Sequence, residues 1–256
     1  MDFRSAQRAI LQLLGSVAPA DRTALLQWMR TTRDFDEFIH DNTDIMLKNI
    51  ADDLRNCLPL ETMLSSEHLA LQKVRFLSHS LSIVELKFIY HHVLPDLSGK
   101  VLVDVGSRLG TVLYGGYLYS SAIQLYGVEL NGDFCQLQEM VIKKYQFSDR
   151  IKVLHADICT QGSLLQNADV IIMNNVFEYF LNEAQQVSAW EYISHNVRKK
   201  GSLLVTVPSL EDSLSGLQTN IELSLWVEEV PLNYEVYPQK DIDREALEQI
   251  HLYKIL

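Results

Sequence analysis

The sequence predicts an α/β domain built on a mostly parallel sheet, preceded by a helical N-terminal cap. Before residue 95, apolar residues recur at helical spacing and runs of β-branched residues are scarce. After residue 99, short apolar strands alternate with helical patterns, which is typical of a parallel sheet. We therefore assign residues 1–95 to the cap and residues 96–256 to the sheet domain.

The helical region contains several segments with an apolar face. The first face is formed by Ala6, Ile10, Leu11 and Leu14. A second helix begins near Pro19 and Asp21, because proline and aspartate are favoured in the first turn of a helix. Further helices are expected over Phe35–Leu54, Leu60–Leu77 and Ile83–Val93. Pro95 ends the last of them, since proline does not continue a helix.

Short apolar runs after residue 99 are strand candidates, and helical patterns lie between most of them. The predicted strands are Val101–Val103, Ile123–Val128, Ile151–Leu154, Val170–Met173, Leu203–Val207, Leu225–Val230 and His251–Leu256. The predicted helices are Leu113–Ser121, Phe134–Tyr145 and Glu183–Val197. No clear helical pattern separates the last two strands. A closing hairpin is the simplest arrangement for them, and it makes the last strand antiparallel.

Composition and charge exclude several classes of protein. Hydrophobic residues make up 47% of the chain and charged residues 21%, which excludes disordered and fibrous proteins. The net charge of −11 argues against the basic surface that binds nucleic acid, so we expect no nucleic-acid partner. No apolar run approaches the roughly 20 residues of a membrane span. These features predict a soluble protein of the cytoplasm or the nucleus, without a membrane partner.

The sequence offers no recognisable metal site. The cysteines Cys57, Cys135 and Cys159 lack the Cys-x-x-Cys spacing of zinc sites, and no His-Glu-x-x-His motif occurs. His91 and His92 are adjacent in a helical segment, so their side chains point in different directions. We therefore expect no metal.

The most informative segment follows the first predicted strand and reads Val-Asp-Val-Gly-Ser-Arg-Leu-Gly, ending at Gly110. Gly106 and Gly110 lie between this strand and a predicted helix. Glycine lets the backbone turn sharply and approach a ligand closely, while a helix N-terminus presents unpaired N–H groups. The segment therefore predicts a ligand-binding loop.

Polar residues also end the next three predicted strands. Glu129 ends the second strand, where a carboxylate can accept hydrogen bonds from both hydroxyls of a ribose. Asp157 ends the third, where it can accept a hydrogen bond from an adenine amino group, and Asn174 and Asn175 follow the fourth. Open α/β sheets bind ligands at the carboxyl ends of their strands. Because four successive strand ends carry such residues, we expect one ligand site there.

Together, Val-Asp-Val-Gly-Ser-x-x-Gly, Gly-Val-Glu, Ala-Asp and the Asn-Asn pair resemble class I S-adenosylmethionine-dependent methyltransferases. The resemblance covers roughly residues 95–256. It implies a Rossmann-like sheet of seven strands with an antiparallel last strand, S-adenosyl-L-methionine as cofactor, and methyl transfer as the activity. The residues that it assigns to the cofactor are Asp104, Gly106, Ser107, Gly110, Glu129, Asp157 and Asn174.

A nicotinamide-binding Rossmann domain is the nearest alternative. There the strand runs straight into Gly-x-Gly-x-x-Gly, whereas Asp104 lies two residues ahead of the first glycine here. One residue departs from the methyltransferase pattern Asp-x-Gly-x-Gly-x-Gly, because Arg108 replaces the middle glycine. Three alternatives follow for its side chain: it pairs with the cofactor carboxylate, it points into solvent, or it obstructs the site and marks a non-catalytic relative.

The Asn-Asn-Val-Phe segment that begins at Asn174 resembles, over a few residues, a motif of the non-SET histone lysine methyltransferases. This implies that Asn174 and Asn175 accept hydrogen bonds from a substrate nitrogen, and Glu178 is a further candidate for the catalytic pocket. The hypothesis favours methylation of a protein amino group in a basic segment, which the net charge of −11 would attract. A small-molecule acceptor, enclosed by the cap, is the competing hypothesis.

Overall fold

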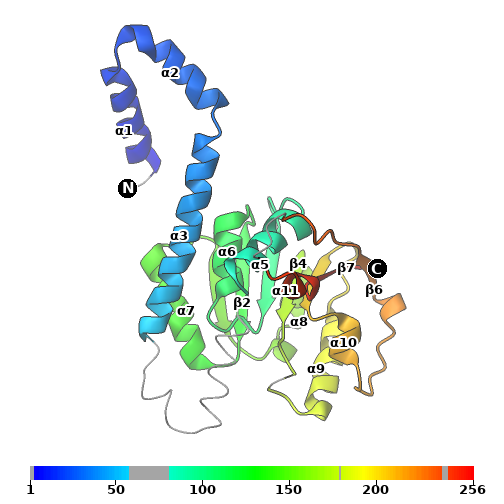
Figure 1. Cartoon of the computed structure of the whole chain (residues 1–256). Helices are drawn as coiled ribbons and strands as arrows, with labels where there is room; N and C mark the ends of the chain where they lie inside the picture. Colours follow the sequence, from blue (N-terminus) through cyan, green and yellow to red (C-terminus); the bar gives the residue numbers. More distant parts are fainter. Residues whose placement is uncertain (1–2, 58–80, 179, 238–241) are drawn as a thin grey trace. The chain divides into compact units, whose positions relative to one another are not determined.

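The computed structural model describes residues 3–57, 81–178, 180–237 and 242–256 (Figure 1). The chain forms two compact units, Met1–Ile45 and Met46–Leu256. The helix α3 (Asp34–Cys57) contributes residues to both units. The helix predicted over Leu60–Leu77 lies outside the described residues.

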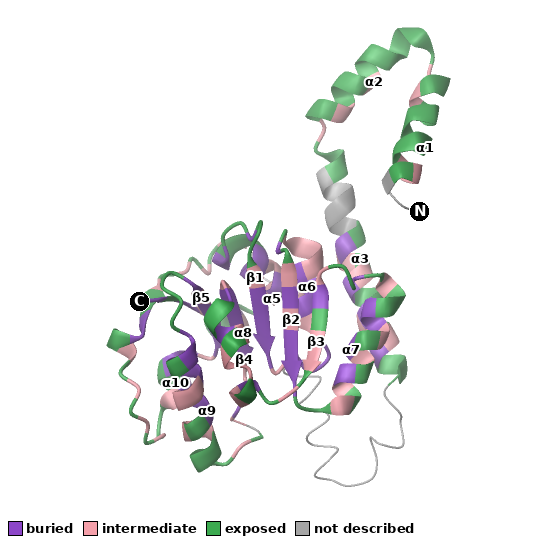
Figure 2. Cartoon of the chain, turned by 180° about the vertical axis from the view of Figure 1, so that it is seen from behind, coloured by how far each residue is buried: buried purple, intermediate pink, exposed green. Residues whose placement is uncertain are grey.

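The first unit consists of α1 (Phe3–Ser16), α2 (Pro19–Thr31) and the beginning of α3. The guanidinium of Arg22 in α2 stabilises the connection to α1, because it donates to the carbonyl oxygens of Gly15 and Val17 at 2.8 Å each. No residue of α2 is buried, and Figure 2 shows that α1 and α2 are largely exposed. The two helices therefore form little apolar core of their own.

The second unit is built on a seven-stranded sheet in the order β3-β2-β1-β4-β5-β7-β6. Its strands are β1 (Val101–Val105), β2 (Gln124–Glu129), β3 (Ile151–His155), β4 (Val170–Asn174), β5 (Leu203–Val207), β6 (Val227–Val230) and β7 (His251–Ile255). β1 to β5 pair in parallel, whereas β7 is antiparallel to both β5 and β6. The predicted α/β sheet with an antiparallel last strand is confirmed.

Helices cover both faces of this sheet, because alternate residues of a strand point to opposite sides. In β1, Leu102 packs into one apolar layer and Val103 into the other. The Leu102 layer includes the second half of α3, α5 (Ile83–Phe88), α6 (Thr111–Tyr119), α7 (Gly132–Tyr145) and α11 (Arg244–Glu248). The Val103 layer includes α8 (Gly162–Asn167), α9 (Glu183–Asn196) and α10 (Leu210–Leu214). The sheet thus carries an apolar core on each side.

The predicted helix Ile83–Val93 is formed by α5 and a following π-helical turn, η2 (Ile89–Val93). A capping box starts it: the hydroxyl of Ser82 accepts the N–H of Glu85, whose carboxylate accepts the N–H of Ser82 at 2.8 Å. Two 3₁₀ turns, η3 (Ile158–Thr160) and η4 (Leu223–Leu225), complete the second unit. The sequence pattern does not predict α8, α10 and α11, because helices of five or six residues are too short to show periodicity.

The hydroxyl of Tyr253 joins β7 to α10. It is buried, accepts the backbone N–H of Leu210 at 3.0 Å and donates to Glu211 at 3.0 Å. We expect Tyr253→Phe to lower the free energy of unfolding by about 1–3 kcal/mol, because a buried N–H loses its acceptor. Urea unfolding followed by circular dichroism measures the change.

Tyr126→Phe is the matched control, because the hydroxyl of Tyr126 makes no hydrogen bond among the described residues. This variant should unfold within about 0.5 kcal/mol of the wild type. Equal stability of both variants would show that the Tyr253 hydroxyl does not hold α10 on the sheet.

Candidate functional site

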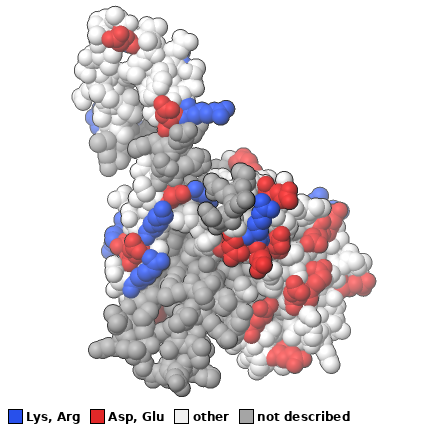
Figure 3. All heavy atoms as spheres, in the orientation of Figure 1, with Lys and Arg blue, Asp and Glu red and all other residues white. Residues whose placement is uncertain are grey.

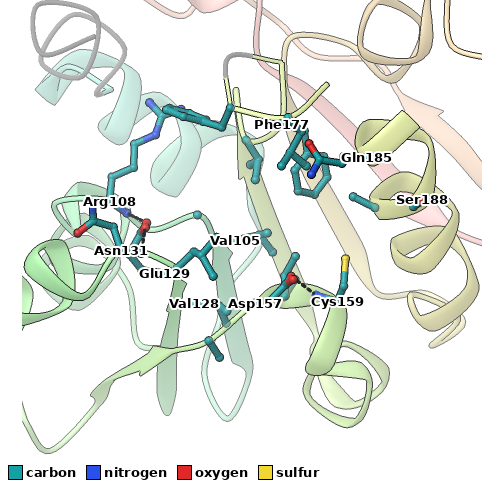
Figure 4. A pocket seen from close by; sticks show the side chains of 18 of the residues that line it. Val105, Arg108, Val128, Glu129, Asn131, Asp157, Cys159, Phe177, Gln185 and Ser188 are labelled. Carbon is teal, nitrogen blue, oxygen red and sulfur yellow. Dashed lines mark hydrogen bonds between the residues drawn. The ribbon is translucent and has the colours of Figure 1, made fainter. Parts of the chain in front are cut away.

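A cavity of about 860 Å³ opens at the carboxyl ends of the parallel strands (Figure 4). One side is formed by the ends of β1, β2 and β3 with the loops that follow them. The other side is formed by the connection from β4 to α9 and by the first turns of α9. Its volume lies in the range of small-molecule sites, and its position is where open α/β sheets bind ligands.

Two glycines shape the loop between β1 and α6. Gly106 and Gly110 have φ angles of +69° and +83°, a left-handed conformation that favours glycine. A Cβ atom on Gly110 would lie 2.6 Å from the hydroxyl oxygen of Tyr114, so a larger residue does not fit. The N–H groups of Gly106 and Ser107 donate to the carbonyl oxygen of Val128 at 2.8 and 3.1 Å. These bonds hold the loop against the end of β2.

Gln138 of α7 holds the same loop through hydrogen bonds to Ser107 and Arg108. Its role was not among the sequence predictions. Its side chain is fully buried, its Oε1 accepts the hydroxyl of Ser107 at 3.0 Å, and its Nε2 donates to the carbonyl oxygen of Arg108 at 2.7 Å. The side chain of Ser107 is therefore turned toward α7. A buried glutamine on an otherwise apolar helix face is the signal that could have found this support.

Glu129 ends β2 at the cavity and is 7% exposed. Its Oε2 accepts the backbone N–H of Arg108 and its Oε1 accepts the backbone N–H of Asn131, each at 2.8 Å. The carboxylate thus connects the loops that follow β1 and β2. Since a carboxylate accepts about four hydrogen bonds, both oxygens retain acceptor capacity.

Asp157 follows β3, lines the same cavity and is exposed. Its Oδ1 accepts the N–H of Cys159 at 2.8 Å and thereby caps η3. Figure 4 shows Glu129 and Asp157 on the side of the cavity formed by the strand ends. Two carboxylates at the ends of neighbouring strands therefore line the cavity and offer acceptor oxygens to it.

Arg108 is only 9% exposed, so the alternative that it points into solvent is wrong. Its φ angle of +48° is left-handed, and its Nη2 donates to the carbonyl oxygens of Asn175 at 2.5 Å and Asn174 at 3.3 Å. The guanidinium also lies 5.5 Å from the centre of the Phe180 ring. The side chain thus spans from the glycine loop to the end of β4. Among the described residues that line the cavity, Arg108 is the only cation.

Asp104 is buried at the end of β1 and is 3% exposed. Burial raises the pKa of this carboxyl well above its usual range; the positive charge of Arg108 opposes that shift, and the negative charge of Glu129 adds to it. Asp104, Arg108 and Glu129 therefore form one electrostatic cluster around the glycine loop.

Asn174, Asn175 and Glu178 do not line the large cavity, although other residues between β4 and α9 do. Asn174 is half-buried, and its Oδ1 accepts Nδ2 of Asn175 at 3.0 Å. Asn175 and Glu178 line a second cavity of only about 10 Å³. Burial raises the pKa of Glu178, and the charge of Asp212 in α10 raises it further. Of the residues predicted for cofactor or substrate, those that line the large cavity are Gly106, Glu129 and Asp157.

Several residues that the sequence analysis did not assign to the site complete the cavity. The apolar members include Phe134, Ile158, Phe177, Phe180 and Leu181. The N-terminus of α9 is fixed by a capping box, in which Asn182 accepts the N–H of Gln185 at 3.0 Å and Gln185 accepts the N–H of Asn182 at 3.1 Å. The Asn-x-x-Gln spacing signals a helix start in the sequence, although it does not reveal that this helix borders a cavity.

The described residues contain no group of His, Cys, Asp and Glu side chains arranged to hold a metal ion. Over the same ranges of the chain, no helix combines the length and the apolar character that crossing a bilayer requires.

Comparison with protein-family models gives no match, and comparison with curated proteins gives no significant match. Solved structures do match. The O-methyltransferase from Bacillus cereus in complex with SAH is 10% identical, with a TM-score of 0.51 over 82% of this chain and 90% of that chain. A methyltransferase from Geobacter sulfurreducens is 14% identical, with a TM-score of 0.45 over 82% and 96%. The likeness to the Bacillus cereus structure establishes the fold: this chain has the Rossmann-like, seven-stranded fold of class I methyltransferases.

The raised pKa of Asp104 predicts a pH-dependent stability. The folded protein holds this proton more tightly than the unfolded chain does, so the unfolding free energy falls as pH rises from about 4 toward the folded pKa. We expect Asp104→Asn, which cannot ionise, to gain stability relative to the wild type as pH rises from about 4 to about 8. Urea unfolding across this range measures the difference.

Asp133→Asn is the control, because Asp133 is exposed at the start of α7. Its difference from the wild type should stay nearly constant over the same range. A constant difference for Asp104→Asn as well would contradict a raised pKa at this buried carboxyl.

Proposed function

We propose that this chain binds S-adenosyl-L-methionine in the large cavity and is a methyltransferase. The observation that carries the proposal is the carboxylate of Glu129, which lies at the cavity beside a glycine loop at the carboxyl end of a parallel sheet. The shared fold with a methyltransferase supports it independently.

The chemistry of the cavity fits an adenosine group. Glu129 offers acceptor oxygens to the two ribose hydroxyls, and Asp157 offers one to an adenine amino group. Phe134 and Ile158 supply apolar surface for the adenine ring. A volume of about 860 Å³ leaves room for the remainder of the cofactor and for part of an acceptor.

Methyl transfer from a sulfonium is an in-line displacement, and the bound cofactor would supply the methyl group. The chain itself must hold the acceptor in line and exclude water. Phe177, Phe180 and Leu181 provide an apolar wall that supports such exclusion. A general base is needed only where the acceptor must first lose a proton.

Isothermal titration calorimetry with S-adenosylmethionine or S-adenosylhomocysteine tests the cofactor. We expect binding by the wild type and a loss of at least about tenfold in affinity for Glu129→Ala, because hydrogen bonds to a carboxylate are lost. Glu139→Ala changes an exposed carboxylate of α7 and should leave the affinity unchanged. Thermal unfolding of each variant shows whether it is folded.

Unchanged affinity in Glu129→Ala would contradict the assigned ribose site. Binding of a nicotinamide dinucleotide, together with no binding of either S-adenosyl compound, would instead favour an oxidoreductase.

For the acceptor, we propose a protein amino group in a basic segment. The acidic charge of the chain supports it, because a cationic chain would be attracted. Acidic residues are frequent in the last part of the sequence and include Glu211, Asp212, Glu222, Glu228, Glu229, Glu235, Asp243, Glu245 and Glu248. Figure 3 shows several groups of acidic side chains on the visible face of the sheet unit. A small molecule is the competing acceptor, and the cavity volume of about 860 Å³ favours it.

Incubation with S-adenosylmethionine labelled in the methyl group separates these acceptors. The protein is supplied with whole-cell protein extract in one reaction and with a metabolite fraction in the other. We expect label in a protein band, and we expect Asn174→Ala to reduce it, because the half-buried Asn174 is the candidate for contacting the acceptor nitrogen. Label found only in the metabolite fraction would contradict a protein acceptor.

A second candidate is a binding module that does not transfer methyl groups. The observation in its favour is the side chain of Arg108, which bridges the glycine loop and the end of β4. On this alternative, the S-adenosyl compounds bind poorly, and Arg108→Gly restores their affinity.

A further inference from the structure

We propose that the second cavity, of about 10 Å³, is a binding site for one water molecule, which Trp190, Thr206 and Glu178 hold behind the wall of the large cavity. The site goes beyond the proposed function, because it depends on neither the cofactor nor the acceptor. It also gives Glu178 a role other than contact with a substrate.

Buried polar groups without hydrogen-bond partners mark the site. Among the described residues, three buried side-chain groups have no such partner: Nε1 of Trp190, the hydroxyl of Thr206 and the hydroxyl of Tyr114. Trp190 and Thr206 are 4% and 1% exposed, and both line the second cavity. Buried polar groups are nearly always hydrogen-bonded, either to protein or to an ordered water. Two such groups at one cavity therefore indicate a polar occupant.

The size and the chemistry of this cavity fit a single water. A water needs roughly 10–15 Å³ of volume on this measure and two to four polar partners. Besides Trp190 and Thr206, the cavity is lined by Asn175, Glu178 and Ser213. An indole N–H can only donate, so the occupant must present a lone pair, which argues against a cation such as ammonium. A water accepts this bond and still has two hydrogens to donate, for which a carboxylate and a hydroxyl oxygen are acceptors.

Glu178 is placed to bind such a water. It lines the second cavity and not the large one, and it is half-buried. Burial and the charge of Asp212 raise the pKa of its carboxyl, and a hydrogen bond from the hydroxyl of Ser213 opposes that shift. A half-buried carboxylate needs further donors to replace the water that it has lost. We therefore assign Glu178 to the water and regard it as a positioning residue.

The water would support the wall of the large cavity from behind. Val176 and Phe177 line both cavities, so the same residues separate them. The ring of Phe177 packs edge-on against Trp190 of α9, with 5.4 Å between ring centres and 90° between ring planes. Thr206 lies in β5, opposite Met173 of β4. A water bonded to Trp190, Thr206 and Glu178 joins α9, β5 and the loop after β4.

NMR of the indole N–H groups tests the site in solution, because the three tryptophans of the chain supply the controls. Nε1 of Trp226, which is 1% exposed, donates to the carbonyl oxygen of Val197 at 2.9 Å, whereas Trp28 is 44% exposed. We expect a dipolar signal to a long-lived water at Trp190 and none at Trp226. Rotating-frame spectra separate this signal from hydrogen exchange, which has the opposite sign and is expected at Trp28. The variants Trp28→Phe and Trp190→Phe assign the resonances.

Substitutions of the other two partners test who holds the water. Thr206→Val keeps the shape but loses the hydroxyl, so it should weaken the water signal at Trp190 at least about twofold and lower the Tm by about 2–4 °C. Thr206→Ser should retain both. Glu178→Gln keeps groups that bond to a water and should retain the signal, whereas Glu178→Leu should weaken it. Thr23→Val, at an exposed position of α2, is the matched control and should change neither the signal nor the Tm.

Three results would overturn the inference. One is the absence of a dipolar water signal at Trp190 in the wild type, and another is a high-resolution crystal structure in which Nε1 of Trp190 donates directly to a protein acceptor. A signal that Glu178→Leu leaves unchanged would contradict the role assigned to Glu178. Failure to bind S-adenosylmethionine would refute the proposed function and leave the water site intact, because the two cavities are separate.

Discussion

The carboxylate of Glu129 is the interaction on which the geometry of the site depends. It accepts backbone N–H groups from Arg108 and Asn131, and so it fixes the loops after β1 and β2 relative to each other. The carbonyl oxygen of Val128 adds two bonds to the glycine loop from the same strand end. The loop is therefore held by backbone N–H groups that donate to a buried carboxylate and to a carbonyl oxygen at the end of β2. Glu129 therefore builds the cavity as well as lining it.

This arrangement concentrates charged side chains in a buried region. Asp104 and Glu129 are both buried at neighbouring strand ends, and Arg108 is the nearby cation. Removing water from two carboxylates is unfavourable unless hydrogen bonds or opposite charge compensate it. Glu129 receives its compensation from N–H groups, whereas burial leaves Asp104 with a raised pKa. The glycine loop thus combines a rigid backbone with an electrostatic field that a bound ligand would alter.

The sheet was predictable from the sequence because each buried parallel strand is a continuous apolar run, as in Val170–Met173. Glu129 and Asp157 were predictable as cavity residues, since the carboxyl ends of parallel strands meet at one edge. The direction of the Arg108 side chain was not predictable from the sequence, because a left-handed φ angle in a loop leaves no periodic signal. For the same reason the sequence did not reveal that Asn175 turns toward a small cavity beside α10. The part of the cavity wall that α9 forms was also not predictable, because it depends on tertiary packing alone.

The sheet order imposes a sequence of events on folding. β7 lies between β5 and β6, and β6 pairs with β7 in the described sheet. β6 precedes β7 along the chain, yet it joins the described sheet only through its pairing with β7. Closing such long-range pairings is slow, because loop entropy is lost before contacts form. During synthesis β7 emerges after β1 to β5, so this edge of the sheet is completed only after the parallel strands that border the cavity have emerged.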